Sequence, residues 1–174
     1  MQTKRRQVFK SAALIALFSF AALGSSTAAF AQEGNECHGP EGSWLYAVTI
    51  PGPYGGSPTV FQGIETYSAG GGYVEADQLS FNPQSLATAG HGPWKSTGER
   101  KFLLTYVNLP YDFVATGNPT GTSKVRQTTT LDRTGNSYSG SGDFKYYDLK
   151  GNVVFSGTFT ITAKRIRVES PAND

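Results

Sequence analysis

Apolar and polar residues alternate with a period of two along most of the chain from residue 42 onward, which is the pattern of β-strands. The clearest segment runs from Trp44 to Ile50, where one face is strongly apolar and the other is mixed. The pattern predicts eight strands and no helix of ordinary length after the first 31 residues. The other seven are expected at 60–67, 73–78, from 90 through 94, 100–109, 123–131, 138–146 and 155–163.

Turn-forming residues separate these segments. Ser68-Ala69-Gly70-Gly71-Gly72 is a turn by composition, because glycine reaches positive φ without a Cβ clash. Residues 132–136 and 148–152 share the pattern Asp-x-x-Gly-Asn, so the last three strands are predicted to run as consecutive hairpins. Residues 79–89 lack alternation and predict a longer loop, with room for one helical turn.

The absence of crossover helices from the pattern predicts an antiparallel sheet. Eight strands joined by hairpins favour an all-β, up-and-down antiparallel barrel over a sandwich of immunoglobulin type, for which the paired cysteines are absent. Glycines recur on one face of the last two strands, at Gly140, Gly142 and Gly157. They fit strongly bent strands that close a small barrel.

The first 31 residues have the order of an export signal. Four cations (Lys4, Arg5, Arg6, Lys10) precede an apolar run from 12 to 23, and Ala29-Phe30-Ala31 fits a cleavage site. General secretion and twin-arginine export both remain open, since a paired arginine precedes Val8 and Phe9. We therefore expect a cleaved signal at 1–31, a flexible segment at 32–41, a barrel at 42–168, a disordered tail at 169–174, and a periplasmic or secreted location.

Cleavage at this site removes the four cations and no anion, so the formal charge moves from +2 to −2. Nucleic-acid binding is not expected, because phosphate recognition needs clustered lysine and arginine. Cys37 is the single cysteine, which forbids an internal disulfide. Cys37 follows Asn35-Glu36 instead of the apolar and small residues of a lipobox, so a lipid on this cysteine, and with it a stable membrane anchor, is not expected.

Two short motifs carry a resemblance to a known family. Gly42-Ser43-Trp44 resembles the Gly-x-Trp signature that opens lipocalin-type barrels, where the tryptophan plugs one end. Gly92-Pro93-Trp94, followed by Gly98 and Phe102, is similar to a segment of small bacterial lipocalin-like proteins. The likeness covers most of 40–167 but lacks the disulfide and C-terminal helix of secreted animal lipocalins. It implies an eight-stranded, calycin-type barrel with a cup for a small, largely apolar ligand.

Catalytic and metal motifs are sparse. His38 and His91 are the two histidines, so neither a metal nor a cofactor is expected. His91 is either a general base at the barrel mouth or a histidine of a flexible loop. Glu65 is the acid of interest: if Phe61, Glu65 and Tyr67 face inward, burial among rings would raise its pKa. The opposite parity leaves Glu65 in water and places residues 60, 62, 64 and 66 inside.

Two functions follow from this chemistry. The first is binding of a small apolar molecule inside the barrel; the alternative is a barrel-templated isomerase or cyclase with Glu65 as its catalytic acid or base. A filled barrel that acts as an interaction module is a third hypothesis. The predicted ligand-binding residues are Trp44, Tyr46, Phe61, Trp94, Phe102, Tyr106, Gln127, Phe144, Tyr146 and Phe159.

Overall fold

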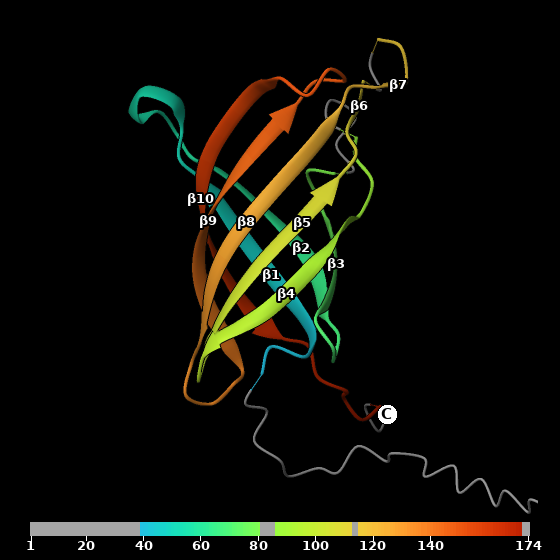
Figure 1. Ribbon diagram of the computed structural model, residues 1–174. Helices are drawn as coiled ribbons and strands as arrows, with labels where there is room; N and C mark the ends of the chain where they lie inside the picture. Colours follow the sequence, from blue (N-terminus) through green and yellow to red (C-terminus); the bar gives the residue numbers. More distant parts are fainter. Residues whose placement is uncertain (1–38, 81–85, 113–114, 172–174) are drawn as a thin grey trace, which may run out of the picture. The chain divides into compact units, whose positions relative to one another are not determined.

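A computed structural model describes residues 39–80, 86–112 and 115–171 of the chain. Eight antiparallel strands close into a barrel in the order β1-β10-β9-β8-β5-β4-β3-β2 (Figure 1). Chain neighbours are barrel neighbours, so the predicted up-and-down barrel is confirmed and the sandwich is excluded. The strands are β1 (Gly42–Ile50), β2 (Thr59–Tyr67), β3 (Gly72–Asp77), β4 (Gly90–Gly98), β5 (Lys101–Asn108), β8 (Thr122–Leu131), β9 (Ser137–Tyr147) and β10 (Val153–Arg165).

Two short strands and a 3₁₀ turn stand outside the barrel wall. β6 (Tyr111–Asp112) and β7 (Asn118–Pro119) pair with each other in the connection between β5 and β8, and the sequence pattern did not predict them. The 3₁₀ turn η1 (Pro53–Gly55) lies between β1 and β2. All three lie at one end of the barrel, which we call the open end (Figure 1).

Several sequence predictions fall outside the described residues. The export signal, Cys37 and His38 lie within 1–38, and residues 81–85 of the loop predicted at 79–89, which had room for one helical turn, also lie outside them. Within 39–80, 86–112 and 115–171, no helix is long and apolar enough to cross a membrane.

Strand register settles which residues point inward. Residues directly opposite each other on antiparallel strands share a face of the sheet. Trp44 of β1 lies opposite Glu65 of β2, and Glu65 lies opposite Glu75 of β3. Trp44 is completely buried, so the side chains of both glutamates also point into the barrel, where Glu65 is 1% and Glu75 is 2% exposed. The sequence left open which face of the strand at 60–67 points inward. In the structure, the face that carries Glu65 points into the barrel.

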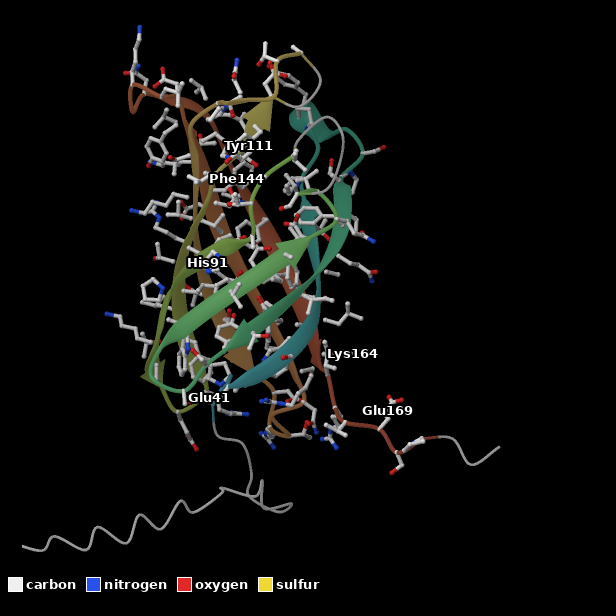
Figure 2. The ribbon with its side chains drawn as sticks, turned by 90° about the vertical axis from the view of Figure 1, so that its right-hand side faces the viewer. Glu41, His91, Tyr111, Phe144, Lys164 and Glu169 are labelled. Carbon is white, nitrogen blue, oxygen red and sulfur yellow. The ribbon has the colours of Figure 1, made fainter. Side chains whose placement is uncertain are left out.

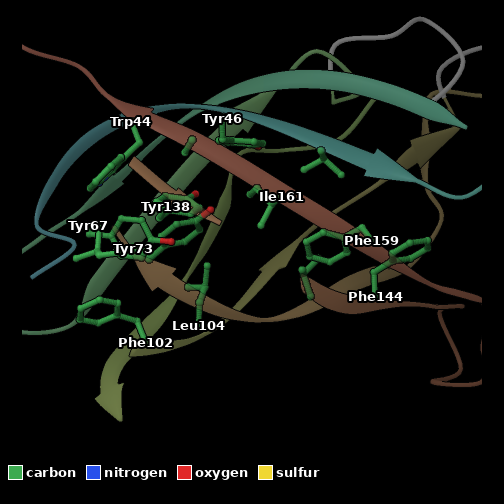
Figure 3. Close-up of a cluster of buried hydrophobic side chains, with 14 residues drawn as sticks. Trp44, Tyr46, Tyr67, Tyr73, Phe102, Leu104, Tyr138, Phe144, Phe159 and Ile161 are labelled. Carbon is green, nitrogen blue, oxygen red and sulfur yellow. The ribbon is translucent and has the colours of Figure 1, made fainter. Parts of the chain in front are cut away.

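Aromatic side chains fill the end of the barrel opposite the open end, which we call the closed end (Figure 3). The Trp44 indole donates a 2.7 Å hydrogen bond to the carbonyl of Pro40 and meets Tyr138 edge to face at 5.1 Å. The guanidinium of Arg165 lies 4.2 Å from the centre of the Trp44 ring, a favourable cation–π geometry. Arg165 also donates to the backbone carbonyls of Gly135 and Gly39, which holds the closed end together.

The glycines of the last two strands lie where a side chain has no room. A Cβ at Gly142 would overlap the carbonyl oxygen of Arg126 and the ring of Phe159. We expect Gly142→Ala to lower the free energy of unfolding by about 1–3 kcal/mol, because the backbone and a core ring must shift. Gly98→Ala is the matched control, since its Cβ would have only ordinary contact with Lys101. Urea unfolding that finds the two variants equally stable would contradict this packing.

Candidate functional site

The interior is not filled along its whole length. A cavity of about 120 Å³ occupies the half of the barrel nearer the open end. Figure 3 shows that Phe144 and Phe159 of its wall lie well away from the Trp44 cluster. Seven of the ten residues predicted to bind a ligand line this cavity: Tyr46, Phe61, Tyr106, Gln127, Phe144, Tyr146 and Phe159.

The other three predicted residues lie elsewhere and do not line the cavity. Trp44 seals the closed end, and Trp94 packs edge to face against Phe102 with ring centres 5.7 Å apart. Trp94 also meets Tyr67 at 6.0 Å and donates to the carbonyl of Ser68. The structure therefore places these rings in the packing of the closed half, and the cavity is built from the remaining seven and their neighbours.

The cavity wall also carries two polar groups, Asp77 and Asn108, that the sequence pattern did not identify. Asp77, at the end of β3, accepts a 2.6 Å hydrogen bond from the backbone N–H of Ser80 through Oδ1. Asn108, at the end of β5, has a buried Oδ1 with no hydrogen-bond partner among the described residues. The predicted Gln127 donates a 2.9 Å bond to Thr129. The wall is thus mostly aromatic, with a few polar atoms in fixed positions.

Glu65 is held in a cage of phenols in the closed half. Tyr73 donates a 2.8 Å hydrogen bond to its Oε2, and Tyr138 donates to Oε1. Burial raises the pKa of Glu65 from 4.5 to about 7, although the hydrogen bonds from Tyr138 and Tyr73 oppose the shift. The side chain has the buried, aromatic surroundings expected for the inward parity, but it does not line the cavity.

Glu75 is a second buried acid, directly across from the first. Its Oε2 accepts a 2.8 Å hydrogen bond from Tyr46, while its Oε1 is buried against the backbone of Gly90 and accepts no well-aligned hydrogen bond from the described residues. Burial, followed by the negative charge of Asp77, raises the pKa of Glu75 to about 7. No lysine, arginine or histidine is among the fully buried side chains of the described residues, so nothing neutralises this pair when both acids are ionised.

Each buried acid lies one phenol away from the cavity. Tyr46 bonds Glu75 and Tyr73 bonds Glu65, and both tyrosines line the cavity wall. Burial, and then the charge of the adjacent glutamate, raises the pKa of each phenol well above its ordinary value. Both hydroxyls therefore stay protonated at neutral pH and act as donors toward the acids.

His91 has neither of the two positions considered for it. It lies in β4, opposite Val107 of β5 and Val74 of β3, and its side chain is exposed on the outer wall (Figure 2). It is therefore neither at the barrel mouth nor in a loop. A catalytic role inside the barrel is not open to it in this position.

A second hollow, of about 710 Å³, is larger but differs in kind. It is an open depression whose lining includes the outward-facing Leu45, Thr162 and Lys164 of β1 and β10. Neither Glu65 nor Glu75 lines it. The smaller cavity is the better candidate site, because it lies inside the barrel and its wall is mainly aromatic and aliphatic, the lining typical of small-molecule sites.

Comparisons with protein families, curated proteins and solved structures found no match. Across the described ranges, no three histidine, cysteine, aspartate or glutamate side chains are grouped so that they could hold a metal ion.

Proposed function

We propose that this protein is an exported, lipocalin-like barrel that binds one small, largely apolar molecule in its interior cavity. The observation that carries the proposal is the interior cavity of about 120 Å³ with a mainly aromatic wall and a few fixed polar atoms. Binding sites of this kind obtain affinity from apolar burial and orientation from the polar groups. The cavity is somewhat smaller than the apolar protein cavity of about 150 Å³ that accepts benzene, so we expect a ligand whose body is no larger than one six-membered ring.

Two further features support the lipocalin-like assignment and export. The tryptophan of Gly42-Ser43-Trp44 packs at one end of an eight-stranded, up-and-down barrel, as the resemblance implies. The first 31 residues have the charge and hydropathy order of a signal peptide, which supports a periplasmic or secreted location. A net charge of −2 after cleavage argues against nucleic acid as the partner.

The alternative, a barrel-templated isomerase or cyclase, is supported by the phenols that separate the cavity from the buried acids. Tyr46 and Tyr73 would be the groups that touch a substrate, with Glu75 and Glu65 behind them. Binding is favoured over this scheme, because neither Glu65 nor Glu75 reaches the cavity and efficient proton transfer needs direct or single-water contact. An enzyme would return a changed compound, whereas a carrier releases its ligand unchanged.

Native mass spectrometry of the protein purified from its own host tests this function. We expect the wild type to retain one small compound. Val125 lies in the cavity wall, so Val125→Phe should fill the space and lose the compound. Val107 lies on the outer wall, 37% exposed, so Val107→Phe should retain it. A wild type without retained ligand, or retention by the Val125 variant, would contradict the proposal; thermal unfolding of each variant checks its folding.

A further inference from the structure

The chemistry of the cavity wall narrows the ligand class, and this step rests on the proposed function. Among the described residues, Asp77 is the one charged residue that lines the cavity, and no lysine, arginine or histidine lines it. Its Oδ1 is engaged by Ser80, and its Oδ2 has no hydrogen bond from any described residue. This part of the wall therefore has negative charge and free acceptor capacity, and no described cation balances it.

The same wall contains a second free acceptor. Asn108 Oδ1 is buried at the end of β5 and has no hydrogen-bond partner among the described residues. A buried acceptor left unpaired costs free energy comparable to a lost hydrogen bond. A ligand that brings hydrogen-bond donors would recover part of this cost.

Aromatic faces surround the acceptors. Tyr46, Tyr73 and Tyr106 line the cavity, and the rings of Tyr73 and Tyr106 lie 5.3 Å apart. The face of an aromatic ring attracts cations through its quadrupole. The rest of the lining is largely phenylalanine and aliphatic side chains, among them Phe144, Phe159 and Val125, with the polar groups of Ser123, Gln127 and Tyr146 between them. The cavity thus combines negative charge and free acceptors with aromatic and aliphatic surface.

We infer that the ligand is a small primary amine with an apolar body, bound as its ammonium ion. Asp77 accepts a hydrogen bond from the ammonium group, and Asn108 supplies a further acceptor. The apolar body of the ligand packs against the phenylalanine rings of the cavity wall. A carboxylate ligand would meet the charge of Asp77 and the acids behind Tyr46 and Tyr73. An uncharged ligand of the same shape would gain the apolar packing but not the charged hydrogen bond.

Calorimetric titration of the full mature protein at neutral pH with three probes of one shape tests the inference. We expect benzylamine, which is protonated there, to bind about tenfold or more tightly than benzyl alcohol, and benzoate not to bind. Asp77→Asn keeps an oxygen for the Ser80 N–H but removes the charge, so it should weaken benzylamine much more than benzyl alcohol and abolish the preference for benzylamine. Asp143→Asn is the control, because Asp143 pairs with Arg126 on the outer wall.

The outcomes separate this inference from the proposed function. Benzyl alcohol or benzoate binding as tightly as benzylamine would overturn the amine assignment and leave the cavity as a ligand site. A preference for benzylamine that survives Asp77→Asn would overturn it too, because Asp77 would not be the acceptor. Absence of binding by all three probes would count against the cavity as a binding site as well. Urea unfolding of the Asp77 variant verifies that it folds.

Discussion

The barrel is expected to be more stable at about pH 5 than at about pH 8, the reverse of proteins whose acids are stabilised in the charged form. Glu65 and Glu75 each have a folded-state pKa raised from 4.5 to about 7. Their contribution to stability is fully present below the unfolded pKa and is lost as the pH rises through the folded pKa, between about 4.5 and 7. Each carboxyl contributes on the order of 3 kcal/mol to the free energy of unfolding at the lower pH. The two contributions are not additive, because the acids interact.

Urea unfolding at these two pH values, with variants of the pair, measures this effect. The double variant, Glu65→Gln with Glu75→Gln, should lose most of the stability difference between the two pH values, because amides do not ionise. Each single variant should lose part of that difference. Glu99→Gln, in the connection between β4 and β5, should keep the wild-type difference. Below about pH 4 a second process enters, since turn hydrogen bonds hold the pKa of Asp132 at about 2. A wild type that is as stable at the higher pH would refute the buried acid pair.

Trp44→Ala is expected to lower the free energy of unfolding by about 3–5 kcal/mol, the range for removal of a large buried ring. The substitution leaves a cavity against Tyr138, removes the bond to the Pro40 carbonyl and deprives Arg165 of its stacking surface. Chemical denaturation measures the change.

Trp44→Phe should recover part of the loss from Trp44→Ala, because it restores a ring without the indole N–H. Leu149, 74% exposed in the turn between β9 and β10, is the control, and its alanine variant should change stability by less than about 0.5 kcal/mol. An equal effect of the Trp44 and Leu149 alanine variants would show that the closed end is not packed as described.

The barrel was predictable because its determinants are local. Alternation marks the strands, and the Asp-x-x-Gly-Asn turns at 132–136 and 148–152 join β8, β9 and β10 into hairpins. The parity of β2 was not predictable from alternation, because Val60 and Ile64 on its outer face are as apolar as an inner face, at 60% and 55% exposed. Register with β1, which the residue pattern of β2 does not contain, decides it.

Part of the candidate site could be predicted from the sequence. Glu65 and Glu75 are equally distant from Gly70 in the turn, so a tight hairpin places them opposite each other on one face. This symmetry was the signal that would have identified Glu75. The division of the aromatic residues between cavity wall and closed end was not predictable. It depends on how individual rings such as Trp94 and Phe102 pack, and a residue pattern does not contain that information.

Binding in the interior cavity is tested most directly by a methyl NMR titration of the protein labelled at isoleucine and valine, with benzyl alcohol as the probe. Val48, Ile50, Val125 and Ile161 line the cavity, whereas Val60, Ile64, Val74 and Val107 are exposed large apolar residues of the barrel strands. A ligand in the cavity should give saturable shifts of the methyl signals of the first four residues and leave those of the second four unmoved. No shifts, or shifts confined to the exposed set, would contradict it.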